Sequence, residues 1–276
     1  MNGLLLFAER TATQVTPTYK RATQKAELTR LSQTLQLVND SVNVHWIVVE
    51  DAEQKTDKIA HLLQRYRLSH THLAVKYNRR GLLQRDCALA WLHSIKNYCQ
   101  KANNANPDGV LYFADDDNTY DVKLFNEILP RVTFVGVWPV GFAGQQLVES
   151  PIVDENQRVS GWLTSWGQER RFATDMAGFG VHMSRIFRHK PSFCSACDVA
   201  GYRETCFLEQ LNITDVSQLQ PFIVYSSNPS STNQSQVESP HGNATIEVLV
   251  WHTRTVAVKQ GTEARPLKMN GADFDV

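Results

Sequence analysis

The sequence lacks any apolar run long enough to cross a lipid bilayer, because a membrane-spanning helix needs about 20 consecutive apolar residues. The longest apolar run near the start, residues 3–8, is also too short for the apolar region of an ordinary signal peptide. We therefore expect either a soluble chain or the luminal part of a protein whose membrane anchor is absent from this sequence.

The sequence also lacks an excess of positive or of negative charge. Lys plus Arg and Asp plus Glu are equal at 28 each, so the net charge is zero. General nucleic-acid binders usually carry a basic face, so this balance argues against that class and leaves room only for a local basic pocket. Hydrophobic residues make up 42% of the 276 residues, which is typical of one large globular domain or two closely joined ones.

Cysteines are few and odd in number, at five. Cys194 and Cys197 have the C-x-x-C spacing, but a structural zinc site needs a second such pair, which the sequence lacks. A short-loop disulfide or two plain thiols is the better interpretation. Four acceptor sequons for N-glycosylation favour, weakly, a secretory compartment; they begin at Asn39, Asn212, Asn233 and Asn243.

Apolar strands alternate with amphipathic helices along the first half of the chain. We predict strands at 14–16 (stopped by Pro17), 44–49, 71–75, 110–113 and 132–137. We predict helices at 23–38, 59–66 and 84–98. This alternation predicts an α/β fold with a mostly parallel sheet and helices on both faces. Later elements are less regular, with a helix at 201–211, an exposed loop at 228–243 and a strand at 246–251.

The most informative stretch is the strand 110–113 followed by Asp115, Asp116 and Asp117. Three adjacent carboxylates repel one another, and a divalent cation bridging to a diphosphate would relieve that repulsion. A solvated turn that caps a helix is the plainer alternative. Ligands of open α/β sheets bind beyond the carboxyl ends of strands. The pair Glu50 and Asp51 follows another strand, so we expect both polar clusters at one edge of the sheet.

Six blocks, in order, resemble the beta-1,3-glucuronosyltransferases, glycosyltransferase family 43. The blocks are 15–19 (VTPTY), 49–53 (VEDAE), 112–120 (YFADDDNTY), 138–141 (WPVG), 175–179 (DMAGF) and 250–255 (VWHTRT). The resemblance implies a GT-A fold and an inverting transfer of glucuronic acid from UDP-glucuronate to the 3-hydroxyl of a terminal β-galactose. It further implies Mn²⁺ as cofactor, a galactose-terminated glycan as acceptor, a homodimer, and the Golgi lumen or membrane as location.

Site residues follow from the resemblance where the motifs match. Glu204 matches the catalytic base, and Asp117 is the expected metal ligand. Residues expected to bind the donor are Tyr19, Asp51, Arg80, Arg85, Asp115, Asp116, His252 and Arg254. Residues expected to contact the acceptor or the transferred sugar are Glu149, Arg170 and Asp175. The resemblance also divides the chain into a donor subdomain at 10–130, an acceptor and catalytic subdomain at 131–258, and a polar tail at 259–276.

Each of these residues has a structural alternative. A glutamate in the first turn of a helix, such as Glu204, is favoured by the helix dipole alone. Asp51 is a candidate helix N-cap, and Glu149 with Arg170 is a candidate salt bridge. His70 and His72 alternate on a strand without an evident carboxylate partner, so we interpret them as edge-strand residues. Of Trp162 and Trp166, at least one is expected in the core.

Two other functions stay open at this point. Ala200 stands where some relatives have a basic residue, which is compatible with a protein that binds UDP or glycans without turnover. Alternatively, the same fold takes a different UDP-sugar. The intact acid triplet and Glu204 favour the enzyme over the first alternative. Arg85 and His252 suit a sugar that carries a carboxylate, which favours glucuronate over other donors.

Overall fold

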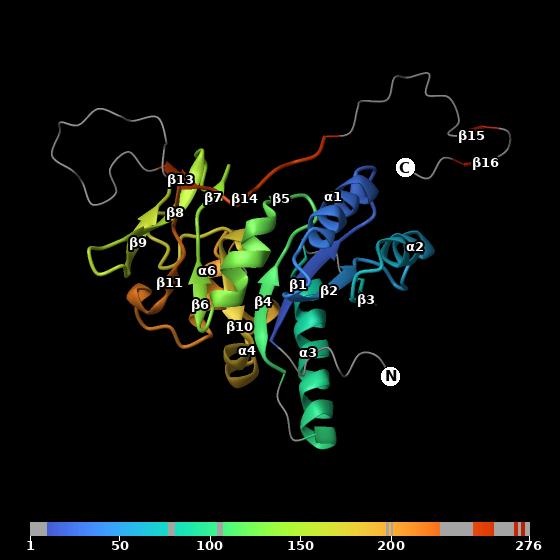
Figure 1. Cartoon of the computed structure of the whole chain (residues 1–276), viewed down its shortest axis with the longest axis horizontal. Coiled ribbons are helices and arrows are strands. Elements are labelled where there is room, and N and C mark those ends of the chain that lie inside the picture. Colours follow the sequence, from blue (N-terminus) through green and yellow to red (C-terminus); the bar gives the residue numbers. More distant parts are fainter. Residues whose placement is uncertain are drawn as a thin grey trace.

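The computed structural model describes residues 10–76, 81–103, 107–196, 199, 201–226, 245–256, 268–269 and 272–273. A seven-stranded sheet forms its centre, and a smaller sheet lies beside it (Figure 1). In order across the central sheet, the strands are β11 (Gln220–Pro221), β6 (Val135–Val137), β10 (Phe179–His182), β4 (Gly109–Phe113), β1 (Thr11–Thr18), β2 (Asn43–Glu50) and β3 (His70–Ala74).

The predicted parallel arrangement is confirmed for four strands, three of which (β1, β2 and β4) carry the donor motifs. β4, β1, β2 and β3 are all parallel neighbours. Only β10 runs antiparallel, between β4 and β6, and β11 is parallel to β6. The carboxyl ends of β4, β1 and β2 therefore meet at one edge, and the acid triplet and Asp51 follow two of these ends.

Pro17 does not stop the first strand, contrary to our prediction. β1 continues to Thr18, with Pro17 opposite Val49 of β2. On the other side, pairing with β4 already ends where Val15 faces Phe113. The missing amide hydrogen of proline therefore breaks no ladder bond on that side, which is where proline is tolerated in sheets.

Helices cover both faces of the sheet, as predicted. One face packs against α1 (Gln24–Gln36) and α2 (Asp57–Tyr66) through Leu28, Leu31 and Ile59. The other face packs against α3 (Leu82–Asn103), α4 (Met183–His189), α5 (Phe193–Ala196) and α6 (Arg203–Glu209). Strand alternation divides the sheet residues accordingly, with Trp46 and Val48 on the first face and Ile47 and Val49 on the second. The predicted helices are confirmed, with ends displaced by a few residues.

The second sheet has five strands. In order they are β5 (Thr119–Tyr120), β14 (Val250–Trp251), β7 (Val140–Gly141), β8 (Val148–Val153) and β9 (Val159–Leu163). Here the predicted single strand at 246–251 is wrong. Its first half is β13 (Thr245–Glu247), which pairs with β12 (Val224–Ser226), and its second half is β14. The two halves of this mainly apolar segment therefore belong to two different sheets.

Short elements complete the described chain. They are the π-helical turn η2 (Leu124–Ile128), the 3₁₀ turns η3 (Leu129–Arg131), η4 (Met176–Gly178) and η5 (Val216–Gln218), and the hairpin strands β15 (Lys268–Met269) and β16 (Ala272–Asp273). β6 begins at Val135 rather than at the predicted Val132, because the Val132 amide closes the η3 turn onto Leu129. The predicted loop at 228–243 lies outside the described residues, as does most of the predicted tail. The proposed subdomain boundaries stay a prediction.

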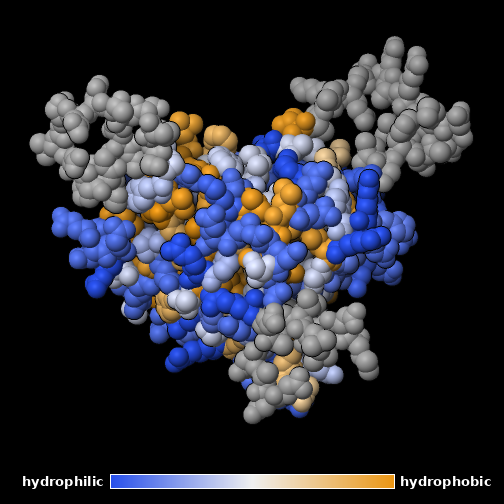
Figure 2. Space-filling view, in the orientation of Figure 1, coloured by the Kyte–Doolittle hydropathy of each residue, from blue (hydrophilic) through white to orange (hydrophobic). Residues whose placement is uncertain are grey.

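The surface is mostly hydrophilic, with apolar patches between (Figure 2). Four large apolar side chains around β7, β8 and β9 are between 46% and 77% exposed, namely Phe142, Leu147, Ile152 and Leu163. In the part of the chain that the structure describes, no helix has the length and apolarity that a bilayer crossing requires.

Candidate active site

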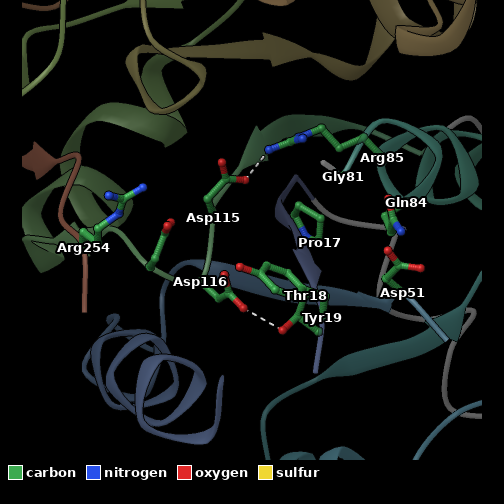
Figure 3. Close-up of a pocket in the computed structure, with 11 residues that line it drawn as sticks. Pro17, Thr18, Tyr19, Asp51, Gly81, Gln84, Arg85, Asp115, Asp116 and Arg254 are labelled. Atoms are coloured by element: carbon green, nitrogen blue, oxygen red, sulfur yellow. Dashed lines mark hydrogen bonds and ion pairs between the residues drawn. The ribbon is translucent and has the colours of Figure 1, made fainter. Parts of the chain in front are cut away.

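A cavity of about 610 Å³ lies at the carboxyl edge of the central sheet (Figure 3). Seven of the residues predicted to bind donor or metal line it together: Tyr19, Asp51, Arg85, Asp115, Asp116, Asp117 and Arg254. They come from the ends of β1, β2 and β4, from the start of α3, and from the segment after β14. The expectation that Asp51 and the acid triplet share one edge is therefore confirmed, and Glu50 is instead buried in the sheet.

Asp116 is the most enclosed carboxylate of the triplet, at 5% exposure. Thr18 donates a hydrogen bond of 2.6 Å to its Oδ2, and Arg21 forms a 2.7 Å ion pair with its Oδ1. Burial raises the pKa of Asp116 to about 6, although Arg21 and Thr18 act in the opposite direction. Arg21 also pairs with the buried Glu27. Arg21 thus pairs with two acids, Asp116 of the triplet and Glu27 in the first turn of α1.

Asp115 pairs with Arg85, which the resemblance had placed near the donor. The Arg85 guanidinium lies 5.9 Å from the ring centre of Phe113 and 5.7 Å from that of Phe193. Gly81 has a positive φ of 78°, and a Cβ there would stand 2.7 Å from Arg85 Nη1. The positive φ favours glycine at this position, and a side chain there would also displace the guanidinium of Arg85.

Asp117 is held through its main chain rather than its carboxylate. Its carbonyl oxygen accepts hydrogen bonds from Arg30 Nη2 at 2.7 Å and from Thr253 Oγ1 at 2.6 Å. Burial, followed by the negative charge of Asp115, raises the pKa of the Asp117 carboxyl. A nearby cation would therefore stabilise the ionised form of this carboxylate, which fits the ligand role predicted for it.

The predicted uridine contacts, Tyr19 and Asp51, both line the cavity. Tyr19 is 57% exposed, and the Arg21 guanidinium covers its ring at 4.4 Å from the centre. An aromatic ring exposed to this degree is available for stacking with a base, unlike the alternative of a half-buried core residue. Asp51 is positioned by its amide, which donates to Thr18 O at 2.8 Å. That bond joins the ends of β1 and β2.

His252, predicted to bind the donor substrate, pairs with Asp175, predicted to contact the acceptor or the transferred sugar. His252 Nδ1 lies 3.1 Å from Asp175 Oδ2, while Asp175 Oδ1 accepts from the amide of Ala177 at 2.9 Å. The bond to Asp175 raises the pKa of His252 to about 9, with Asp117 and Asp115 adding to the effect. The imidazole is therefore cationic at neutral pH.

Glu204 lies in the first turn of α6, half-buried. Burial, followed by the charge of Asp175, raises the pKa of Glu204 to about 7, while Arg85 and Arg170 act in the opposite direction. Glu204 is thus within electrostatic reach of both the donor cavity and the predicted acceptor residues. A carboxyl with this pKa changes its protonation near neutral pH, which a general base requires.

Glu149 and Arg170 form a buried pair, at 3% and 6% exposure. Arg170 Nη2 donates to Glu149 Oε1 at 3.0 Å and to the carbonyl of Trp166 at 3.0 Å, and Thr164 donates to Glu149 at 2.7 Å. The Arg170 guanidinium covers the Trp166 ring at 4.4 Å. The pair therefore supports Trp166, whereas Trp162 packs against the core, as expected for at least one of the two tryptophans.

Two predicted features lie outside the described residues, namely Arg80 and Ala200. Other residues of the site were missed. Thr18 and Arg21 flank the predicted Tyr19, and Gln84 lines the cavity beside Arg85. Their signal was adjacency to predicted residues in the first motif and at the start of α3. Arg30 gave no such signal, since it lies on a helix far from any motif.

One prediction about the histidines is wrong. His70 and His72 do lie on the edge strand β3. However, His72 Nε2 is 2.7 Å from Glu50 Oε1, so a carboxylate does accompany it. Glu50 also accepts from the Thr56 hydroxyl at 3.0 Å. The partner comes from the neighbouring strand, where sequence alternation on one strand cannot reveal it.

Comparison with solved structures first defines the class. TarS from S. aureus (residues 1–349) matches with a TM-score of 0.54 at 12% identity, covering 88% of this chain and 60% of that chain. The same TarS fragment in complex with UDP matches with a TM-score of 0.51 at 12% identity, again over 88% and 60% of the two chains. At such identity the likeness shows the fold alone. The fold is that of the GT-A glycosyltransferases.

The family follows from sequence comparison. The model of glycosyltransferase family 43 matches residues 31–256, and this chain belongs to that family. Human galactosylgalactosylxylosylprotein 3-beta-glucuronosyltransferase 2 is 41% identical over 91% of this chain and 71% of its own length. Human 3-beta-glucuronosyltransferase 1 of the same series is 38% identical over 90% and 70%, and sqv-8 of Caenorhabditis elegans is 37% identical over 91% and 65%. The chain is therefore an enzyme of the beta-1,3-glucuronosyltransferase group.

Proposed function

We propose that the chain transfers glucuronic acid from UDP-glucuronate to the 3-hydroxyl of a terminal β-galactose on a glycan or proteoglycan linker. One observation carries the proposal. The acid triplet lines a cavity together with Tyr19 and Asp51. Arg85, which lines the same cavity, acts electrostatically on the carboxyl of Glu204 and lowers its pKa, opposing the effect of burial. The cavity proposed for the nucleotide therefore lies close to Glu204, the proposed proton acceptor.

The donor is held by complementary groups along the cavity. Tyr19 stacks on the uracil, and Asp51 accepts hydrogen bonds from it. Arg254 lines the cavity on the side opposite Asp51 (Figure 3), where it meets the diphosphate together with the cationic His252. Arg85 is fixed by Asp115 and presents its remaining donors to the glucuronate carboxylate, because guanidinium suits planar anions.

Manganese is the proposed cofactor, and Asp117 is its protein ligand. Within the described residues, no three His, Cys, Asp or Glu side chains are grouped so that they could hold a metal ion. The proposal therefore needs a hard cation that takes one or two carboxylates and completes its shell with substrate phosphates and water. When bound, the cation neutralises charge that develops on the departing UDP.

Glu204 is the proposed general base. Its carboxylate takes the proton from the acceptor 3-hydroxyl while that oxygen forms the new bond to the anomeric carbon, and the bond from that carbon to UDP breaks. A single displacement of this kind inverts the anomeric centre. The pKa of about 7 keeps a substantial fraction of Glu204 ionised at neutral pH and makes it a stronger base than an ordinary carboxylate.

The acceptor side is assigned to Asp175, Glu149, Arg170 and Trp166. Asp175 is partly exposed and accepts from sugar hydroxyls while it holds His252. Glu149 and Arg170 are buried, so their contribution passes through the Trp166 ring that Arg170 covers. An aromatic face of this kind packs on the apolar side of a pyranose.

The decisive experiment combines the chain with UDP-glucuronate, MnCl₂ and a panel of β-galactosides, and measures UDP release with mass spectrometry of the products. The proposal predicts a mass gain of one glucuronate on a terminal galactose. UDP binding by calorimetry without transfer to any galactoside would instead support a non-catalytic homologue. Transfer from UDP-galactose or UDP-N-acetylglucosamine in preference to UDP-glucuronate would overturn the donor assignment.

A homodimer in the Golgi is proposed alongside the reaction. The exposed side chains of Phe142, Leu147, Ile152 and Leu163 support an association surface on the second sheet, since apolar patches often mark contacts between proteins. Light scattering at micromolar concentration tests the dimer, and a monomer at every concentration would exclude it. Fluorescence microscopy of the tagged full-length protein tests the compartment.

A further inference from the structure

We propose that Arg30 of α1 is a positioning residue for Asp117: its guanidinium fixes the main chain of the acid turn so that the Asp117 carboxylate is presented to the cation. This inference rests on the proposed function, because it assigns a role within the same metal-dependent donor site. It adds a residue that lies outside every motif and does not line the cavity.

Arg30 reaches two segments that are far apart in the sequence. Its Nη2 donates to the carbonyl oxygen of Asp117 at 2.7 Å and to that of Asn118 at 3.2 Å. Its Nη1 donates to Thr255 Oγ1 at 3.3 Å. One side chain therefore joins the acid turn to the segment that carries His252 and Arg254.

The main chain of the acid turn is held by side chains from several elements. Thr16 of β1 donates to the carbonyl of Ala114 at 2.6 Å, and Tyr120 of β5 donates to that of Asp115 at 2.8 Å. Thr253 donates to the carbonyl of Asp117 at 2.6 Å. Among these donors and Arg30, only Arg30 is charged, and charge-assisted hydrogen bonds are roughly twice as strong as neutral ones.

The three arginines around the triplet are used differently. Arg85 and Arg21 pair directly with the carboxylates of Asp115 and Asp116. Within the described part of the chain, the acceptors of Arg30 are carbonyl and hydroxyl oxygens, not carboxylates. It therefore fixes the main chain of the turn without occupying the Asp117 carboxylate, which stays available as a metal ligand.

The test compares Arg30→Met with Arg65→Met, a substitution of an exposed arginine on α2. Calorimetry measures UDP affinity for each variant with and without MnCl₂, and thermal unfolding is followed without metal or nucleotide. We expect the gain in UDP affinity from manganese to fall about tenfold or more in Arg30→Met, because the acid turn loses two charge-assisted hydrogen bonds to its main chain. Affinity without manganese should stay within about twofold of wild type, and Arg65→Met should match wild type throughout.

A second variant separates positioning from stability. Lysine at position 30 keeps the charge but offers a single donating head, so Arg30→Lys should recover part of the manganese-linked gain. A purely structural role would lower the unfolding temperature and leave that gain unchanged in every variant that folds. Should Arg30→Met fail to fold, Arg30→Lys decides, and a gain equal to that of wild type overturns the inference.

The two proposals fail in different ways. If UDP binding by the wild-type chain does not respond to manganese, the metal assignment in the proposed function is wrong. If the wild type responds and Arg30→Met responds equally, the proposed function stands and the role of Arg30 is wrong.

Discussion

The donor cavity and the surroundings of Glu204 both contain carboxylates that are at least partly buried. The charged groups nearest to these carboxylates differ between the two regions. In the cavity, Asp115 and Asp116 each pair with an arginine, Arg85 and Arg21. Around Glu204 the largest charge effect comes from another acid, Asp175, which raises its pKa further. Two acids of the cavity are thus held in ion pairs, whereas the charge that acts most strongly on Glu204 is negative.

The difference corresponds to two tasks. A site for a cation and a diphosphate needs carboxylates that stay ionised, and Asp116, with a pKa of about 6 despite its burial, meets that need at neutral pH. A general base must bind and release a proton during each turnover, and a pKa of about 7 serves this need. Burial raises the pKa of both carboxyls, and the charged partners differ: Arg21 opposes the rise at Asp116, whereas Asp175 adds to it at Glu204.

Removing the base tests the second region and should have the largest effect. Glu204→Gln keeps the shape of the side chain but cannot take a proton, so transfer should fall by about 10²–10⁴-fold, the usual contribution of general base catalysis. Initial rates of UDP release measure the loss. Glu209→Gln, an exposed residue of the same helix, is the matched control and should retain full activity. Unchanged turnover in Glu204→Gln would reject the assignment of the base.

Breaking the buried pair next to the site should strongly lower stability. Glu149→Ala leaves the Arg170 guanidinium buried without its carboxylate, which typically costs about 3–5 kcal/mol. Denaturant titration followed by tryptophan fluorescence measures this change in the free energy of unfolding. A variant as stable as wild type would show that the ion pair does not contribute to the stability of the fold.

Removing the expected metal ligand tests the first region. Asp117→Asn keeps an oxygen donor but loses the charge, so the concentration of manganese that gives half-maximal transfer should rise by at least about 10–100-fold, the range seen even for outer-shell changes. EDTA should stop transfer in the wild type, and excess manganese should restore it. Full-speed transfer in the presence of EDTA contradicts the metal assignment.

The pH dependence should show the smallest effect and distinguish the two kinds of carboxylate. The ordinary pKa of Glu204 is 4.5 and the folded value is about 7. Transfer should therefore fall as the pH drops through 7, to about a tenth of the plateau one unit below that value. Measurement of kcat/KM from pH 4 to 8.5 checks this expectation. An acid limb centred near 4.5 would show that Glu204 is not the base.

Stability follows the same titration with the opposite sign. Because the folded state binds the Glu204 proton more tightly, this group favours folding most below pH 4.5. That contribution is lost progressively as the pH rises to 7. Glu204→Gln should therefore unfold at a higher temperature than wild type at pH 8, and the difference should shrink at pH 5. This is the trade-off expected of a residue kept for catalysis.

Much of the fold could be predicted because local pattern determines it. The segments 44–49, apolar apart from His45, and 110–113, apolar throughout, are bounded by polar residues and form the buried strands β2 and β4. The order of parallel strands placed Asp51 and the acid triplet at one edge without further information. The split of 246–251 into β13 and β14 could not be predicted, because a change of strand partner depends on distant segments.

The candidate site was predictable to the extent that motifs mark it. Tyr19 and Asp115 stand in recognisable blocks. Arg30 acts through main-chain carbonyls some 87 residues away, an arrangement with no local sequence signature. The pairing of Glu50 with His72 was missed for the same reason, because it joins neighbouring strands through side chains.

The small β5–β14 pairing has a consequence for synthesis of the chain. β5 follows the acid turn at once, yet its partner β14 comes more than a hundred residues later, with Trp251 opposite Thr119. Closing so long a loop is entropically costly and slow. A nascent chain on the ribosome can form β1 to β4 early, but the candidate donor cavity is completed only once the segment that carries Arg254 has emerged. Truncation before that segment should leave a folded central sheet with an incomplete cavity, and calorimetry with UDP tests the loss of binding that we expect.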